Sequence, residues 1–250
     1  MYEILEIKQL NELVKSMVIK APYVARRCEP GQFVIIRSHE DGERIPLTIA
    51  DYDRENETIT IVYQELGFST KKLSTKKVGE SLEDVAGPMG VAAPAEKYER
   101  VLGIGGGVGI APLYPQVKNL ASLGAEVHTI LGGRTADLVI MEDQFKDYSE
   151  VTVATDDGSK GIKGTVVDAM KDLIAEKKFD KVIAIGPVPM MRAVVEVTKE
   201  LDIPTTVSLN PIMIDGTGMC GGCRVTVGGE TKFACVDGPD FDGFLVDFDE

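Results

Sequence analysis

Three of the four cysteines of this 250-residue chain lie within sixteen residues near its C-terminal end. The run Asp215-Gly-Thr-Gly-Met-Cys220-Gly-Gly-Cys223 is followed by Cys235. Small residues allow the backbone to wrap around sulfur atoms and to donate N–H groups to them. This segment therefore predicts a metal ion or an iron–sulfur cluster, with Asp215, Cys220, Cys223 and Cys235 as its candidate ligands.

Two kinds of centre compete for these ligands. Structural zinc is usually held by four cysteines or by three cysteines and a histidine, and an aspartate is a less common fourth ligand. A plant-type [2Fe–2S] cluster uses the spacing C-x₄-C-x₂-C with a fourth, distant cysteine, and here Asp215 takes the place of the first cysteine. We favour the cluster, in which an oxygen ligand would alter the reduction potential because it donates less covalently than a thiolate. Whether Asp215 is a true ligand stays open at this point, and Cys28 is interpreted as an ordinary lone cysteine.

The composition is that of an ordinary soluble globular protein, with 44% hydrophobic and 27% charged residues. A net charge of −13 argues against a nucleic-acid partner, because no basic stripe is present to neutralise phosphates. No apolar run is long enough to span a membrane, and the first residues do not resemble a secretion signal. We therefore expect a cytoplasmic protein, in whose reducing surroundings clustered cysteines serve as metal ligands.

Residues 1–97 are expected to form an all-β domain. Short segments that are typical of strands are separated by turn signals such as Glu29-Pro30-Gly31, and this spacing predicts a closed or nearly closed β-barrel. The expected strands are Tyr2–Gln9, Val14–Lys20, Gln32–Arg37, Pro46–Asp53 and Thr58–Gln64. Ser69–Leu73 is predicted to be a short helix, and Gly87-Pro88-Met89-Gly90 is predicted to be a turn that closes the domain.

Residues 98–210 show alternating strands and helices, which predicts a parallel sheet with helices on both faces. The fold class is thus α/β plus all-β, and the boundary to the cysteine segment, 211–250, lies where the periodicity stops. The expected strands are Val101–Ile104, Glu126–Leu131, Val151–Thr155, Lys181–Ile185 and Thr205–Leu209, and the expected helices are Ala111–Leu123, Asp137–Asp147, Gly164–Lys177 and Val188–Leu201.

A glycine-rich run, Gly103-Ile-Gly105-Gly106-Gly107-Val-Gly109-Ile-Ala-Pro112, follows the first strand of this domain and opens a helix. Glycines permit a tight turn and a close backbone approach, and the helix N-terminus offers N–H groups to a pyrophosphate. The run alone is also compatible with a plain strand–helix turn, but its position favours a dinucleotide site. Arg134, after the second strand, is either a ligand for a 2′-phosphate or a solvated surface residue, so NADH and NADPH both stay open.

Two motifs in the β domain favour a flavin. In Arg44-Ile-Pro46-Leu47-Thr48 an arginine precedes an extended segment whose backbone can bond the edge of a planar ring, and Gly67-Phe-Ser69-Thr70 opens a short helix toward a pyrophosphate. Each motif in isolation is as easily a turn or a helix cap. The two histidines, His39 and His128, lie in no catalytic constellation, and no hydrolytic triad is visible.

The order of these motifs resembles the ferredoxin–NADP⁺ reductase superfamily. The resemblance is carried by Pro30-Gly31-Gln32-Phe33, Arg44–Thr48, Gly87–Gly90, Gly105–Pro112 and Gly186-Pro187-Val-Pro189-Met190-Met191. The cysteine segment narrows it to the group that contains the electron-transfer subunit of B-type dihydroorotate dehydrogenase. Aspartate at position 215 departs from that subunit and is more similar to the small (alpha) subunit of NADH-dependent reduced ferredoxin:NADP⁺ oxidoreductase, which is sulfide dehydrogenase-like.

The resemblance implies binding residues for two further cofactors. FAD would be lined by Arg44, Pro46, Leu47, Thr48, Gly67, Ser69 and Thr70. NAD(H) would be bound by Gly107, Val108, Gly109, Pro112, Arg134, Asp157, Gly186, Pro187 and Met190. Many members of the superfamily have a cysteine before the Gly-Pro pair, but this chain has Ile185.

The resulting hypothesis is an electron path of three cofactors. NAD(H) would exchange a hydride with the flavin, and single electrons would pass through the [2Fe–2S] cluster to a larger flavin/iron–sulfur subunit in a heterodimer. The cofactors would carry the chemistry, so no catalytic side chain is named. In the resembling complex that partner bifurcates electrons between ferredoxin and NADP⁺. The alternatives are the electron-transfer subunit of dihydroorotate dehydrogenase and a zinc-stapled, nucleotide-binding regulatory protein.

Overall fold

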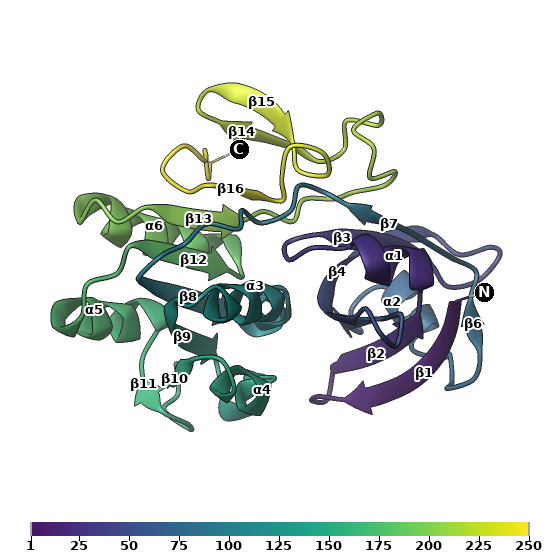
Figure 1. Ribbon diagram of the computed structural model, residues 1–250, viewed down its shortest axis with the longest axis horizontal. Coiled ribbons are helices and arrows are strands. Elements are labelled where there is room, and N and C mark those ends of the chain that lie inside the picture. Colours follow the sequence, from purple (N-terminus) through teal and green to yellow (C-terminus); the bar gives the residue numbers. More distant parts are fainter. Residues whose placement is uncertain (1, 250) are drawn as a thin grey trace. The chain divides into compact units, whose positions relative to one another are not determined.

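The computed structural model describes residues 2–249. Its first half is a curled antiparallel sheet in the order β6-β1-β2-β5-β4-β3-β7 (Figure 1). Two short helices accompany these strands. The elements are β1 (Tyr2–Gln9), β2 (Val14–Lys20), α1 (Pro22–Arg27), β3 (Phe33–Arg37), β4 (Arg44–Asp53), β5 (Thr58–Gln64), α2 (Phe68–Leu73), β6 (Ser81–Leu82) and β7 (Asp84–Met89).

The core of this sheet is made of aliphatic side chains on one face. Successive side chains of a strand point to opposite faces, so alternating residues are buried together. Met17 and Ile19 on β2 and Ile59 and Ile61 on β5 are fully inaccessible to solvent. Burying each such side chain stabilises the fold by about 1.5–3 kcal/mol, which explains why the strands were predictable from the pattern.

Two local expectations for this half need correction. The predicted turn at Gly87–Gly90 is wrong, because residues up to Met89 belong to β7 and Met89 pairs with Phe33. The register shifts between Phe33 and Ile35, and Gly87 has a φ of 155°, so the glycine and proline form a bulge within a strand. Helix α1 was not expected, although Pro22 at its first turn is a common helix start.

A parallel sheet forms most of the second half, in the order β11-β10-β9-β8-β12-β13-β16. Only β16 runs antiparallel to its neighbour, β13. Helices α3 and α4 lie on one face of the sheet, and α5 and α6 lie on the other (Figure 1). The strands are β8 (Arg100–Gly106), β9 (Glu126–Gly133), β10 (Glu150–Thr155), β11 (Ile162–Lys163), β12 (Lys181–Ile185), β13 (Thr205–Ser208) and β16 (Asp240–Asp242), and the helices are α3 (Ile110–Ser122), α4 (Glu142–Lys146), α5 (Val166–Glu176) and α6 (Val188–Glu200).

The single helix predicted at Asp137–Asp147 is wrong. The structure has a 3₁₀ turn at Ala136–Leu138 and then α4, separated by extended Val139 and by Met141 in the left-handed region with φ 59°. The intervening Ile140 is buried. Burial of this side chain holds the segment extended, and tertiary packing therefore overrides the local helical pattern.

The described chain divides into two compact units. The first contains the chain up to Ala93 together with 210–224 and 233–239, and the second contains 94–209, 225–232 and 240–249. The hairpin of β14 (Arg224–Val227) and β15 (Glu230–Phe233) lies at this division. The three-domain boundaries at 97 and 210 stay a prediction. Within residues 2–249, no helix is both long and apolar enough to cross a membrane.

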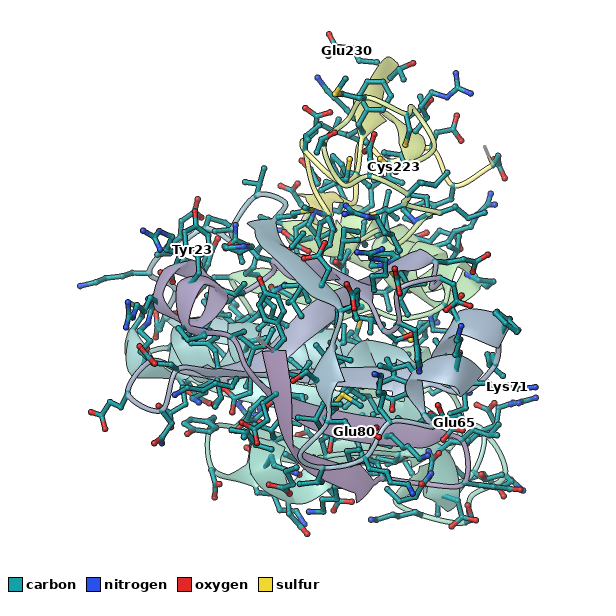
Figure 2. The ribbon with its side chains drawn as sticks, turned by 90° about the vertical axis from the view of Figure 1, so that its right-hand side faces the viewer. Tyr23, Glu65, Lys71, Glu80, Cys223 and Glu230 are labelled. Carbon is teal, nitrogen blue, oxygen red and sulfur yellow. The ribbon has the colours of Figure 1, made fainter. Side chains whose placement is uncertain are left out.

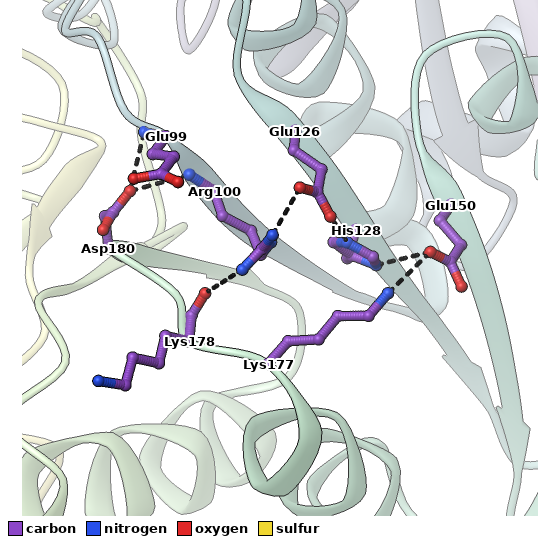
Figure 3. A network of polar contacts seen from close by, with 8 residues as sticks. All are labelled: Glu99, Arg100, Glu126, His128, Glu150, Lys177, Lys178 and Asp180. Atoms are coloured by element: carbon purple, nitrogen blue, oxygen red, sulfur yellow. Dashed lines mark hydrogen bonds and ion pairs between the residues drawn. The ribbon is translucent and has the colours of Figure 1, made fainter.

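A network of charges links the amino ends of the parallel strands (Figure 3). Glu126 accepts a hydrogen bond of 2.7 Å from Arg100 and bonds the buried His128 at 2.8 Å. Glu150 pairs with His128 at 3.2 Å and with Lys177 at 3.0 Å. The bonds from Arg100 and His128 hold the pKa of Glu126 down at about 2. The network therefore ties together the ends of β8, β9 and β10.

This network predicts an acid-sensitive contribution to stability. The folded pKa of Glu126 is depressed, so its contribution is present above the ordinary pKa of 4.5 and is lost as pH falls toward about 2. Glu126→Gln should lower the free energy of unfolding at pH 7, and its difference from wild type should shrink from pH 5 to pH 3. Urea unfolding across that range measures both. Glu176→Gln at the end of α5 is the control, and an equal loss in both variants at pH 7 would contradict the assignment.

Candidate functional site

The cysteine loop is folded around the carboxylate of Asp215. Its two oxygens accept hydrogen bonds from the backbone N–H groups of Thr217 and Cys220, each at 2.8 Å. These bonds hold the pKa of Asp215 below its usual value. Gly216 and Gly218 have φ of 73° and 82°, in the left-handed region that favours glycine. The loop conformation thus depends on one carboxylate and on residues without a Cβ.

The thiols differ in exposure. Cys223 and Cys235 are buried with their sulfurs 3.2 Å apart, whereas Cys220 is exposed. Figure 2 shows Cys223 inside the C-terminal segment. Burial and the neighbouring Cys223 thiol raise the pKa of Cys235 to about 11, so a bound metal would have to displace its proton.

Backbone N–H groups are directed at two of the three sulfurs. Gly222 donates to Cys220 at 3.5 Å, and the N–H of Cys235 donates to Cys223 at 3.4 Å. Among residues 2–249, no three His, Cys, Asp or Glu side chains already converge as ligands of one metal ion. Three thiols, two of them with N–H donors at their sulfurs, nevertheless fit the donor set of an iron–sulfur cluster. The sequence predicts such N–H donors in general, whereas the identity of the individual donors depends on the folded course of the loop.

The loop packs closely against the curled sheet of the same compact unit. A Cβ at Gly216 would lie 2.3 Å from the sulfur of Met89 and 3.1 Å from Ile35. A second contact follows Cys235, where the carbonyl of Gly238 accepts a hydrogen bond of 2.7 Å from Val91. The candidate cluster ligands and the candidate flavin strands therefore belong to one packed body.

The segment Arg44–Thr48 is the first half of β4 and is paired on one side only. Pro46, Leu47 and Thr48 lie opposite Ile35, Val34 and Phe33 of β3, while pairing with β5 begins at Ile49. These three side chains are half-buried, and Arg44 forms an exposed ion pair of 3.1 Å with Asp84. The unpaired side of the strand offers backbone groups to a ring system, as the flavin interpretation requires.

The other predicted flavin residues lie beside the start of β4. Gly67 caps α2, and the Thr70 hydroxyl exchanges hydrogen bonds of 3.2 Å with the Gly67 backbone. The Ser69 hydroxyl donates to Glu43, the residue before Arg44. A Cβ at Gly67 would meet nothing within 4 Å. The structure thus brings both flavin motifs together, with open space at the cap.

The dinucleotide turn lies at the carboxyl end of β8. Gly107–Gly109 form one 3₁₀ turn that leads into α3, with Val108 half-buried in it and Pro112 in the first turn of the helix. A Cβ at Gly109 would lie 2.4 Å from the carbonyl oxygen of Ile185. Only glycine allows this approach, which positions the N-terminus of α3 against the end of β12.

The predicted segment Gly186–Met190 meets the same edge of the sheet. The sulfur of Met190 covers Gly106 and Gly186, where added Cβ atoms would lie 2.4 Å and 3.1 Å from it. Pro187 precedes α6 and is exposed. Crevices at the carboxyl ends of parallel strands are where such sheets bind nucleotides, and binding of a dinucleotide by these residues stays a prediction.

Arg134 and Asp157 follow the neighbouring strands β9 and β10 and are both exposed. The N–H of Asp157 donates to the carbonyl of Arg134 at 3.2 Å. Its carboxylate accepts bonds from the N–H and hydroxyl of Ser159, which hold its pKa low, and the Ser159 hydroxyl accepts from Ala136. Ser159 was not predicted, although Asp-Gly-Ser is a typical turn signal.

Comparison with known proteins agrees with this geometry. Residues 210–247 match the iron–sulfur cluster binding domain of dihydroorotate dehydrogenase B, and residues 104–196 match the oxidoreductase NAD-binding domain. A dihydroorotate dehydrogenase B (NAD⁺) electron transfer subunit homolog from Thermotoga maritima is 51% identical, over 96% of this chain and 89% of that protein. The dihydroorotate dehydrogenase B (NAD⁺) electron transfer subunit of Fusobacterium nucleatum is 37% identical, over 92% of each chain.

Solved structures are similar at two levels. A chain from the structure of NADH-dependent reduced ferredoxin–NADP oxidoreductase, solved for insights into flavin-based electron bifurcation, superposes with a TM-score of 0.95 at 49% identity, over 100% of this chain and 90% of that chain. The FAD/NAD-binding domain of nitric oxide dioxygenase from Vibrio cholerae shares the fold, with a TM-score of 0.63 at 18% identity, over 81% of this chain and 93% of that domain.

These findings confirm the predicted resemblance and the fold class, which is a curled antiparallel sheet, a parallel dinucleotide-binding sheet and a C-terminal iron–sulfur segment. They support FAD, a [2Fe–2S] cluster and NAD(H) as cofactors of an oxidoreductase subunit. The chain belongs to the family of dihydroorotate dehydrogenase B electron transfer subunits and their homologues.

Proposed function

We propose that this chain is the small, electron-transferring subunit of a bifurcating NADH/ferredoxin:NADP⁺ oxidoreductase. It exchanges a hydride with NAD(H) at FAD and relays single electrons through the cluster to a larger flavin/iron–sulfur subunit. The observation that carries the proposal is the 49% identity, over the whole chain, to the NADH-dependent reduced ferredoxin–NADP oxidoreductase structure. Aspartate at position 215, in the place of the usual first cysteine, agrees with it.

The side chains and backbone of this subunit hold cofactors and need no acid or base of their own. When bound, the flavin converts between two-electron and one-electron transfer. The unpaired side of Arg44–Thr48 and the open cap at Gly67, Ser69 and Thr70 hold it. The turn from Gly107 to Pro112, with Gly186, Pro187 and Met190, holds the dinucleotide by close backbone approach. Arg134 and Asp157 flank its far end.

The packing of the cysteine loop supports a relay. The loop belongs to the same compact unit as the flavin strands, through the contacts of Gly216 with Met89 and of Gly238 with Val91. The dinucleotide turn belongs to the other unit. Single-electron relay requires a constant distance between flavin and cluster. A preorganised site within one compact unit keeps that distance through turnover.

Aspartate 215 is proposed as the fourth cluster ligand, and its replacement tests that role. Asp215→Cys should change the electron paramagnetic resonance signal of the reduced cluster, because a thiolate replaces an oxygen donor. Asp237→Asn is the matched control, since Asp237 also accepts a loop N–H, from Phe233 at 2.6 Å, but lies outside the ligand pattern. An unchanged signal in Asp215→Cys would remove Asp215 from the coordination sphere.

The exposed apolar side chains of the cysteine loop support a protein partner at the cluster. Met219 is 89% exposed and Ile212 is 78% exposed, in a loop that also carries the exposed Cys220. Ile214 and the sulfur of Cys220 both lie within 4 Å of the Cβ position of Gly222. Large exposed apolar residues gathered around a polar centre are typical of docking surfaces.

Loss of this surface should weaken the complex without loss of the cluster. Met219→Glu should lower the affinity for the larger subunit by about tenfold or more, the effect of losing an interface contact worth about 1.4 kcal/mol. Biolayer interferometry with the copurifying subunit measures it, and cluster absorbance should stay unchanged. Leu201→Glu, at an equally apolar exposed position after α6, is the control. Full affinity in Met219→Glu would contradict a docking role.

The second candidate is the electron-transfer subunit of a dihydroorotate dehydrogenase. The match of residues 210–247 and the 37% identical relative from Fusobacterium nucleatum favour it. The chemistry of this chain would be the same and the partner would differ. Copurification with a subunit that oxidises dihydroorotate would establish this role in place of the bifurcating one.

A further inference from the structure

Asp240 begins the last strand of the parallel sheet. It follows Pro239 at the point where the chain passes into the second compact unit. On β16 it lies opposite Ser208 of β13, and Phe241 lies opposite Val207. Strand β16 contributes only three residues to the edge of the sheet, and the residues after Gly243 are held by separate bonds, such as that of Asp247 to Thr226 and that of Asp249 to Arg192.

The carboxyl group of Asp240 is enclosed between β13 and α3. Its Oδ2 accepts a hydrogen bond of 2.8 Å from the amide of Gln116, which is only 3% exposed. The side chain of Ser208, opposite Asp240 on β13, acts to lower the pKa of the carboxyl group. Although the residue as a whole keeps some accessible surface, Oδ1 is closed off from solvent and has no hydrogen-bond partner among residues 2–249. An ionised carboxylate here would place negative charge on a buried oxygen that has no partner, which costs more than leaving a neutral oxygen there.

The charges that face this carboxyl group do not neutralise it. Lys181 on β12 is the cation that acts on it, and Asp242 and Glu96 act on the same lysine. Burial lowers the pKa of Lys181, and no ion pair within 4 Å joins it to Asp240 in the described chain. Burial raises the pKa of Asp240 to about 6, against the opposing effects of Ser208, Gln116 and Lys181.

We propose that Asp240 is a proton-operated latch, which in its neutral form holds β16 against β13 and α3 and which loosens residues 240–243 from β13 when it ionises. The neutral form avoids a buried charge in the enclosed site. Ionisation of Asp240 therefore affects two elements: β16, which follows the cluster cysteines, and α3, which follows the dinucleotide turn. The latch rests on these contacts and does not depend on the proposed function.

The direction of the pH dependence follows from the raised pKa. The folded segment keeps its proton up to about pH 6, whereas the released carboxyl group has its ordinary value of 3.8. Closure of the latch is therefore complete below the ordinary value and is lost progressively as pH rises to about 6. Between pH 5 and pH 7.5 this linkage weakens closure by about tenfold.

Amide hydrogen exchange of the complete, cofactor-loaded protein tests the latch. After correction for intrinsic exchange rates, protection of residues 205–208 and 240–243 should fall by about tenfold from pH 5 to pH 7.5 in the wild type. Asp240→Asn should abolish the dependence because an amide does not ionise. Asp242→Asn, on the same strand, should keep it.

A second variant retains the carboxyl group. Gln116→Leu removes a hydrogen bond that lowers the pKa of Asp240, so the midpoint of the pH dependence should move upward. This measurement tests the proposal even if Asp240→Asn fails to fold. Protection that is independent of pH in the wild type, or that loses its pH dependence in Asp242→Asn and keeps it in Asp240→Asn, would overturn the proposal.

Discussion

Both candidate binding regions depend on one constraint. In each, a glycine lies so close to a neighbouring segment that no side chain would fit between them. At Gly109 the turn before α3 lies so near the carbonyl of Ile185 that a Cβ would come within 2.4 Å of it. At Gly216 the cysteine loop lies equally close to Met89. At both positions a Cβ would clash, so the turn and the loop can approach their neighbours only with glycine there. The functional chemistry is thus built mainly from backbone, with side chains serving as anchors.

Stability and function occupy opposite ends of the parallel sheet. The amino ends carry the ion network of Arg100, Glu126, His128, Glu150 and Lys177, which joins neighbouring strands. The carboxyl ends carry the glycine turn and the exposed loops of Arg134 and Asp157, where we propose that the dinucleotide binds. This separation agrees with the general placement of ligand sites in open α/β sheets.

Much of this architecture could be predicted from local pattern. Alternation identified β1, β2 and β5, and the glycine run located the dinucleotide turn before any tertiary contact was known. The sequence-based predictions were wrong where tertiary packing determines the local conformation. Burial of Ile140 interrupts the expected helix at Asp137–Asp147. Gly87 lies in a bulge within β7, where the sequence indicated a turn. The Gln116–Asp240 bond joins residues distant in the sequence, so no motif could indicate it.

The central claim is that one chain holds a flavin and an iron–sulfur cluster that NADH can reduce. Metal and flavin analysis of the anaerobically purified wild-type protein, followed by titration with NADH under visible absorption, tests it most directly. The account predicts iron and FAD, and a flavin and cluster spectrum that NADH bleaches. Zinc without flavin, and no absorption that NADH bleaches, would contradict it and would favour a zinc-stapled nucleotide-binding protein.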